Sequence, residues 1–189
     1  MIADTFPNPA FNPSTQTGTA VLAGGCFWCT EGAFLALGGV TAVRPGYAGG
    51  SADTANYKAV CEGTTGHAEV IEITYDTTRL SYGDILKIFF WLAHDPTQKN
   101  RQGHDVGSQY RSAIFYQDAL QKEIAEKYIA QLNAARVFDA PIATTVEKLD
   151  AFYVAESYHH NYAALNPMQG YIRAVAQPKI DKVKQYQNK

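Results

Sequence analysis

The sequence is short of cysteine, of net charge and of long apolar stretches. Its three cysteines are an odd number and cannot build a disulfide framework, so we expect reduced thiols. The net charge of −2 gives no electrostatic reason to expect a nucleic-acid partner. No apolar run approaches the roughly 20 residues of a membrane span, and residues 1–17 lack the basic-then-apolar order of a secretory signal. These absences predict a cytoplasmic protein that binds neither nucleic acid nor membrane.

The chain does have enough apolar material for one buried core. It contains 189 residues, 46% of them apolar, and shows no internal repeat and no long linker. Pro7, Pro9 and Pro13 mark residues 1–17 as a flexible N-terminal arm, which leaves residues 18–189 as a single domain. The 12 tyrosines suit a pocket that binds and orients a small polar group. No feature indicates oligomerisation, so we expect a monomer.

Alternating and helical patterns divide the domain into short elements. Ser81 and Asp84 resemble a capping box at a helix start, and Asp118 with Gln121 indicates the start of another helix. Residues 45–50 and 95–109 indicate loops, and regular patterns weaken beyond Leu149. The expected strands cover residues 19–23, 40–43, 67–75, 112–116 and 142–147, and the expected helices cover 26–37, 81–92 and 118–135. We therefore predict an α+β fold, a two-layer α/β sandwich with a ferredoxin-like split βαβ core, a mostly antiparallel sheet and an irregular C-terminal segment.

Cys26 stands where an expected strand ends and an expected helix begins. Free amides and the helix dipole stabilise an anion there, so the pKa of this thiol should be lowered, and Gly24 and Gly25 should leave the sulfur accessible. The alternative is a buried structural cysteine at a tight junction. Phe27 and Trp28 either form an apolar wall beside the thiol or pack in the core, and their spacing alone favours the core.

Cys29 follows Cys26 by three residues on the same side of the expected helix. At this spacing the two Cβ atoms lie roughly 5–6 Å apart, so a disulfide between them is feasible with modest strain. A zinc site would need two further ligands, and the adjacent His159 and His160 lack the spacing for it. We therefore expect no bound metal and no other bound cofactor.

Glu69 is the best candidate for a general acid. Strand alternation places it on one face with Ile71, Ile73 and Tyr75, which should pack inward. A carboxyl group at the end of an inward row loses solvation, so its pKa rises and it can donate a proton near neutral pH. The alternative is a solvated carboxylate at an exposed strand end. Glu72 points to the opposite face and is a weaker candidate.

Five segments stand together in an order typical of one known family. The two longest are Tyr57 through Val70 (YKAVCEGTTGHAEV) and Asp95 through Ile114 (DPTQKNRQGHDVGSQYRSAI). The others are Gly25-Cys26-Phe27-Trp28, Gly46-Tyr47-Ala48-Gly49-Gly50 and the weaker Ala155-Glu156-Ser157-Tyr158-His159. In these segments, which span nearly the whole chain, the sequence resembles the A-type peptide methionine sulfoxide reductases.

The resemblance implies a reaction and assigns roles to residues. The substrate would be the S epimer of methionine sulfoxide, free or in proteins, and the product methionine, as in oxidative protein repair. The family's nucleophile, which attacks the sulfoxide sulfur, matches Cys26, and its general acid matches Glu69. The remaining matches are Phe27 and Trp28 in the wall that holds the substrate methyl group, Tyr57 and Tyr110 as donors to the sulfoxide oxygen, and Asp105 in the network near the thiol. The thiol would become a sulfenic acid that must be reduced again.

The chain departs from the family pattern near its C-terminus. Many members carry a resolving cysteine just after a Gly-Tyr pair, whereas Gly170-Tyr171 is followed here by Ile172 and no later cysteine. We hypothesise that Cys29 resolves the sulfenic acid through a local disulfide, which thioredoxin or a similar dithiol then reduces. Cys61 is expected to be a small buried apolar residue. Direct reduction by glutathione or glutaredoxin is the rival within the same function.

Two other functions compete with this interpretation. The Cys26-x-x-Cys29 pair could serve a thiol–disulfide oxidoreductase, although the surrounding segment lacks a thioredoxin-like context. The chain could also be a non-enzymatic small-molecule or zinc-binding module. Comparing insulin reduction with methionine sulfoxide reduction separates the first alternative, and metal analysis separates the second.

Overall fold

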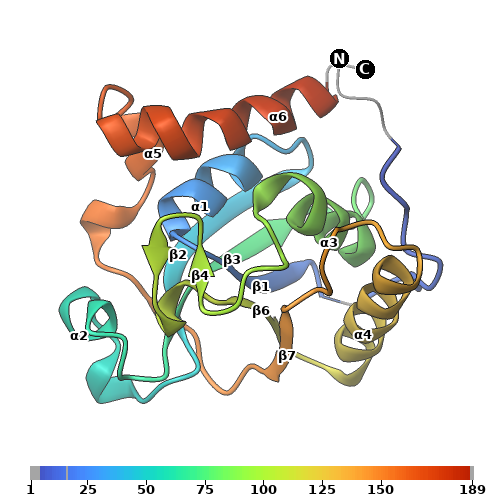
Figure 1. The fold of residues 1–189 in the computed structure, drawn as a ribbon, viewed down its shortest axis with the longest axis horizontal. Coiled ribbons are helices and arrows are strands. Elements are labelled where there is room, and N and C mark those ends of the chain that lie inside the picture. Colours follow the sequence, from blue (N-terminus) through green and yellow to red (C-terminus); the bar gives the residue numbers. More distant parts are fainter. Residues whose placement is uncertain (1–4, 16, 188–189) are drawn as a thin grey trace.

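The protein is described by a computed structural model over residues 5–15 and 17–187, and it is built around a six-stranded sheet (Figure 1). The strand order is β7-β6-β1-β3-β2-β8. Neighbouring strands are antiparallel except β6 and β7, which are parallel. The strands are β1 (Thr19–Gly24), β2 (Val40–Ala48), β3 (Ala68–Tyr75), β6 (Ser112–Tyr116), β7 (Thr145–Lys148) and β8 (Tyr153–Val154). The mixed helix–strand composition and the mostly antiparallel sheet agree with the prediction.

β2 is longer than predicted. The predicted strand ends at Val43, but β2 continues through Pro45 and pairs with β3 as far as Ala48 opposite Ala68. The carbonyl of Pro45 accepts a hydrogen bond from the Ala155 amide at 2.9 Å, so the proline is accommodated beside β8. The loop predicted to begin at residue 45 is therefore wrong for residues 45–48, because pairing on both sides of the strand overrides the local glycine and proline signals.

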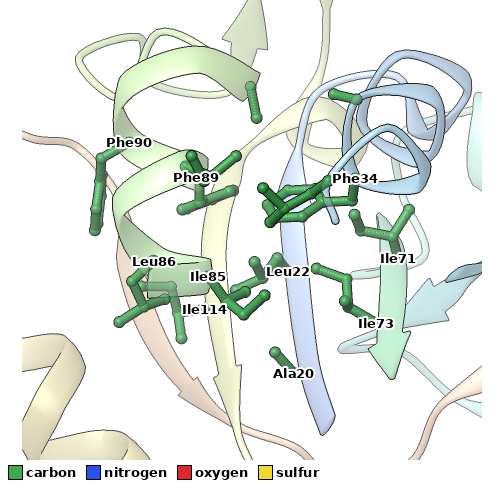
Figure 2. Packing of buried hydrophobic residues seen from close by; sticks show 14 of the residues in the cluster. Ala20, Leu22, Phe34, Ile71, Ile73, Ile85, Leu86, Phe89, Phe90 and Ile114 are labelled. Atoms are coloured by element: carbon green, nitrogen blue, oxygen red, sulfur yellow. The ribbon is translucent and has the colours of Figure 1, made fainter. Parts of the chain in front are cut away.

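Three helices cover one face of the sheet: α1 (Phe27–Leu35), α3 (Tyr82–Ile88) and α4 (Ala119–Ala134). Figure 2 shows Phe34 of α1 and Phe89 after α3 above Leu22 and Ile71 of the strands. Both predicted helix caps are present. Ser81 and Asp84 form a capping box at α3, and at α4 the Asp118 side chain accepts a hydrogen bond from the Gln121 amide. The predicted helix through Leu92 ends as a π-helical turn, η2 (Phe89–Ala93).

The opposite face of the sheet carries a second, smaller apolar cluster. Apart from Phe115, its strand residues are alanines and valines, and Leu149 and Phe152 from the segment before β8 pack against them. The members are Val21, Ala23, Ala48, Ala68, Val70, Ala113 and Phe115. The sheet is thus buried on both faces, which explains why its central strands are almost continuously apolar.

The C-terminal part of the chain is more regular than predicted. It forms a short helix α5 (Tyr162–Leu165), a π-helical turn η5 (Ile172–Ala176) and an 11-residue helix α6 (Gln177–Gln187). α5 and α6 lie across α1 on the side away from the sheet (Figure 1). The expected irregular segment is therefore wrong over these residues. The helical pattern of α6 is faint because only Ile180 and Val183 of this helix are buried.

The polar loop of residues 95–109 contains a small hairpin whose two strands, β4 (Arg101–Gln102) and β5 (Asp105–Val106), have two residues each. A single 3₁₀ turn, η3 (Ser108–Tyr110), follows the hairpin and leads into β6. The short helix α2 (Tyr57–Cys61) precedes β3. Together these connections bring the polar loop and α2 to the end of the sheet where α1 begins, which places the matched segments around one site.

Contacts hold the N-terminal arm over residues 6–12. Phe6 is buried and stacks on Trp91 with ring centroids 5.7 Å apart, and the Tyr128 hydroxyl donates to the Pro7 carbonyl at 2.6 Å. Residues 1–4 and 16 of the expected flexible arm lie outside the described residues. Among residues 5–15 and 17–187, every helix is too short or too polar to cross a lipid bilayer.

Candidate active site

Cys26 occupies the N-cap position of α1, separated from the end of β1 by Gly25 alone. Gly25 has a φ of +86°, and a Cβ at this position would lie 2.6 Å from the Gln102 side chain. Only glycine therefore allows both the turn and the close approach of the polar loop. Cys26 is 8% exposed, so its sulfur is nearly enclosed.

The predicted low pKa of Cys26 is wrong. The hydrogen bond with the Cys29 side chain, burial and the nearby Glu69 together raise the pKa of Cys26 well above its ordinary value. The backbone amide of Trp28 at the helix start acts in the opposite direction, as predicted, but it is outweighed. Cys26 is therefore a neutral thiol at rest, and it needs a partner that takes its proton during attack.

Glu69 lies on β3 and is 2% exposed, as strand alternation predicted. Its Oε2 accepts a hydrogen bond from the Phe27 amide at 2.9 Å, so the carboxyl group contacts the first residue of the helix that Cys26 caps. Burial raises the pKa of Glu69 to about 8, although the Phe27 amide partly offsets this effect. The carboxyl group is thus mostly protonated at pH 7 and is positioned as an acid beside the thiol.

Tyr57 begins α2 and Tyr110 ends η3, and both are half-buried. Burial raises the pKa of each phenol, and the charges of Glu69 and Cys26 act on both in the same direction. Both hydroxyls therefore stay protonated and can donate hydrogen bonds. Because Glu69 and Cys26 act on both phenols, the four groups share one site.

Phe27 and Trp28 point to different surroundings. Phe27 is 1% exposed and packs in the core, with its ring centroid 5.8 Å from that of Tyr47. Trp28 is half-buried; its indole nitrogen donates to His159 Nδ1 at 3.0 Å, and its ring stacks on Tyr162 with centroids 3.9 Å apart. Trp28 is thus fixed in position and still offers apolar surface beside Cys26.

Glu156 and His159 are site residues to which the sequence analysis assigned no role. Glu156 accepts hydrogen bonds from the Tyr47 hydroxyl at 2.7 Å and from the Tyr57 amide at 2.8 Å. Burial opposes its ionisation, but these hydrogen bonds hold the pKa of Glu156 below its ordinary value. His159 is fully buried, 4.4 Å from the Tyr57 ring between centroids. Both residues belong to the weakest matching segment, which was the only signal for them.

Cys29 is 1% exposed and lies between Cys26 and the C-terminal segment. Its thiol donates to the Tyr171 hydroxyl at 3.7 Å, and Tyr171 donates to Asp105 Oδ2 at 2.5 Å. The hydrogen bond with Cys26, and to a smaller degree the charge of Lys179, lower the pKa of Cys29 despite its burial. Asp105 is thus connected to the thiol pair through Tyr171.

Cys61 is exposed, so the expectation of a small buried residue is wrong. It is the last residue of α2, and partial desolvation raises the pKa of Cys61, whereas a hydrogen bond with Tyr57 acts in the opposite direction. All three cysteines are free thiols. Within the described part of the chain, no group of three or more His, Cys, Asp or Glu residues is arranged to hold a metal ion.

The sequence of this chain matches a family model described as "Peptide methionine sulfoxide reductase" over residues 18–189. The chain belongs to this family. It is therefore an oxidoreductase that acts on methionine sulfoxide. The resemblance seen in the five segments is thereby confirmed.

Relatives of this reductase are known from sequence and from structure. A "Peptide methionine sulfoxide reductase MsrA" of Natronomonas pharaonis is 53% identical over 170 residues, which cover 90% of this chain and 95% of the relative. Mxr1 from Saccharomyces cerevisiae in reduced form has a similar fold, with a TM-score of 0.74 and 31% identity over 85% of this chain and 92% of Mxr1. Mxr1 in complex with Trx2 gives a TM-score of 0.51 and 23% identity, over 84% of this chain and 91% of that chain.

Proposed function

We propose that this reductase converts the S epimer of methionine sulfoxide, free and in proteins, to methionine by attack of Cys26 on the sulfoxide sulfur, with Glu69 as general acid. One observation carries the proposal. The Glu69 carboxyl group is buried, has its pKa raised to about 8, and bonds to the amide next to the nucleophile. A sulfoxide oxygen is a poor leaving group unless it is protonated, and a neutral acid at this position can protonate it.

The reductive step balances with these two groups. The Cys26 sulfur forms a bond to the sulfoxide sulfur while Glu69 gives its proton to the oxygen. Glu69 then takes the thiol proton of Cys26, whose raised pKa means that this proton is still present when substrate arrives. Transfer of the hydroxyl group to Cys26 breaks the bond to the substrate and releases the thioether. Cys26 becomes a sulfenic acid, oxidised by two electrons, and methionine sulfoxide is reduced by two.

The remaining site residues bind and orient the substrate. Tyr57 and Tyr110 supply two protonated phenols for the developing charge on the oxygen. Trp28 supplies an apolar surface for the methyl group, held by His159 and Tyr162. Phe27 backs this surface from the core.

Cys29 resolves the sulfenic acid in this scheme. Its sulfur attacks Cys26, the S–S bond forms, the S–O bond breaks, and the hydroxyl group leaves as water after protonation by Glu69. The interaction between the two cysteine side chains, which shifts the pKa of both thiols, supports the proposal. Thioredoxin then reduces the disulfide, as the complex of the related Mxr1 with Trx2 suggests. Glutathione or glutaredoxin is the rival reductant.

The central strands and the helices between them follow the order of a known fold. We propose that β1, β2, β3 and β6 form a ferredoxin-like split βαβ core within one catalytic domain of residues 18–189. The strand order β6-β1-β3-β2, with α1 after β1 and α3 after β3, supports it. In this arrangement the nucleophile follows the first strand and the acid lies on the neighbouring strand, so the core itself joins them.

The test supplies the S and R epimers separately to wild type, Cys26→Ser and Cys29→Ser, with thioredoxin or glutathione as reductant. We expect turnover of the S epimer alone, no methionine from Cys26→Ser, and about one methionine per enzyme from Cys29→Ser with thioredoxin. Cys61→Ser, which changes the exposed thiol, is the matched control and should turn over like wild type. Equal turnover of both epimers, or full turnover by Cys29→Ser with thioredoxin, would contradict the scheme.

A further inference from the structure

Three elements far apart in sequence meet in a chain of hydrogen bonds that ends on Cys29. Cys29 on α1 donates to the Tyr171 hydroxyl at 3.7 Å, and Tyr171 donates to Asp105 Oδ2 on β5 at 2.5 Å. Tyr171 lies just before η5 and is half-buried. The direction of the two hydrogen bonds runs from the thiol to the carboxylate, which is the direction in which a proton would leave Cys29.

Because Cys29 is buried, its proton needs a neighbouring acceptor when the thiol reacts. Cys29 is 1% exposed, so bulk water does not reach its proton directly. When its sulfur attacks the Cys26 sulfenic acid, that proton has to move to another group, and Tyr171 is the hydroxyl that already accepts it. We propose that Tyr171, backed by Asp105, is the positioning residue of the resolving step and relays the Cys29 proton to the Asp105 carboxylate. The proposal rests on the resolving role of Cys29.

With Tyr171 and Asp105 as proton acceptors, the atoms and protons balance when Cys29 attacks the Cys26 sulfenic acid. Cys29 forms the S–S bond to Cys26 as its proton passes to the Tyr171 oxygen and the Tyr171 proton passes to Asp105. The S–O bond of the sulfenic acid breaks, and Glu69 supplies the proton that turns the hydroxyl group into water. Asp105 is half-buried at the hairpin and returns its proton to solvent, from which Glu69 is reprotonated. One water molecule is released and no net proton is gained or lost.

The surrounding charges favour this direction. Burial, followed by the charges of Cys26 and Cys29, raises the pKa of Tyr171, so the phenol relays a proton and does not ionise. The charged and titratable groups that face Cys29 are Cys26, Tyr171, Asp105, Lys179 of α6 and Glu69 of β3. Hydrogen bonds with Cys26 and Tyr171 and the charge of Lys179 favour a developing thiolate at Cys29, whereas burial and the charge of Asp105 oppose it. Because the sulfur is buried, its proton has to pass to a neighbouring group during attack.

The residue after Tyr171 helps to fix the position of this tyrosine. Ile172, directly after it, is fully buried and packs in the apolar cluster that contains Cys26 and Cys29. Position 172 is therefore used for packing. This packing anchors the residue next to Tyr171, whose hydroxyl group lies 3.7 Å from the Cys29 sulfur.

The experiment mixes reduced enzyme with one equivalent of S-methionine sulfoxide and no reductant. It follows methionine release and Cys26–Cys29 disulfide formation separately in the same sample. In Tyr171→Phe, disulfide formation should slow by about 100-fold relative to methionine release, with a trappable sulfenic acid accumulating. The slow phase should recover as the pH rises toward the ordinary thiol pKa, because hydroxide then replaces the relay. A residue that acts only through packing would not give this pH rescue.

Two more variants make the outcome decisive. Asp105→Asn keeps the shape but cannot accept the proton, so it should also slow disulfide formation relative to methionine release. Tyr116→Phe, which removes a hydroxyl at the far end of β6, should leave that ratio at the wild-type value. If wild type forms the disulfide and Tyr171→Phe forms it at the same rate and with the same pH profile, the relay is overturned while Cys29 keeps its role. If wild type itself accumulates sulfenic acid without a Cys26–Cys29 bond, the resolving role of Cys29 fails instead.

Discussion

The protonation state of the Glu69 carboxyl group should control the rate of the reductive step. Its pKa is raised from the usual 4.5 to about 8, because β3 buries the carboxyl group. Only the protonated form donates, so methionine release in a single turnover should be constant at neutral pH and should fall as the pH rises through about 8. Glu69→Gln should be slower by a factor of about 10² to 10⁴ and should lose this titration. Stopped-flow measurements from pH 6 to 10 provide the check.

The conservative variant separates proton donation from shape. Glu69→Asp keeps an acid on a shorter side chain, so it should retain part of the rate together with a titration in the alkaline range. Circular dichroism and the melting temperature show whether each variant is folded. A Glu69→Gln enzyme with the wild-type single-turnover rate would count against the general-acid role.

Single residues also show where sequence reasoning stops. The burial of Glu69 followed from strand alternation, a local pattern that tertiary structure preserved. The pKa of Cys26 did not follow from its helix position, because the dominant effect comes from the Cys29 side chain and from enclosure by distant segments. His159 was marked only by the weakest of the five matching segments, since its contact with Trp28 joins residues 131 positions apart in the chain.

Between elements, the buried Glu31 joins α1 to the C-terminal segment. Its Oε1 accepts a hydrogen bond from the Asn161 amide at 2.9 Å, just before α5, whose Tyr162 stacks on Trp28. Glu31 is 1% exposed, and burial raises its pKa. The carboxyl group therefore holds the segment in place but is costly to ionise there.

Two variants at Glu31 should have opposite effects on stability. The folded state binds more protons than the unfolded state between the ordinary pKa of 4.5 and the raised value, so the unfolding free energy of wild type falls as the pH rises through this window. Glu31→Gln keeps an acceptor and stays neutral, so its stability relative to wild type should increase with pH above 4.5. Glu31→Ala should lose about 1–3 kcal/mol. Urea unfolding at pH 4 and pH 7 tests both, and a constant difference between Glu31→Gln and wild type would refute the assignment.

The helices and strands that were predicted correctly show a local pattern in their own residues. β1, β3 and β6 read as apolar or alternating strands, and α3 and α4 show their caps in the sequence. α6 was missed because it is a polar helix that two buried residues attach to α1. Its stability comes from packing against another element and not from its own pattern, and a single sequence does not show such packing.

At the scale of the whole molecule, the N-terminal arm connects with the helices around the core. Phe6 stacks on Trp91, and Trp91 contacts Tyr186 of α6 with ring centroids 5.3 Å apart. α6 in turn lies on α1, which carries the nucleophile (Figure 1). The prolines of the arm indicate flexibility in the sequence, and nothing local to Phe6 signals a partner 85 positions away.

Phe6→Ala tests whether the arm is part of the folded unit. Phe6 is 9% exposed, so its removal leaves a cavity beside Trp91, and the unfolding free energy should fall by about 3 kcal/mol. Thr5→Ala, at an exposed neighbour, should change it by less than about 0.5 kcal/mol. The rate of methionine release per turnover should stay unchanged in both, because the hydrogen bonds and ring contacts of residues 5–15 do not involve Cys26 or Glu69. Equal urea midpoints for the two variants would show instead that the arm adds nothing to the stability of the domain, and that the stacking of Phe6 on Trp91 leaves α6 and the site unaffected.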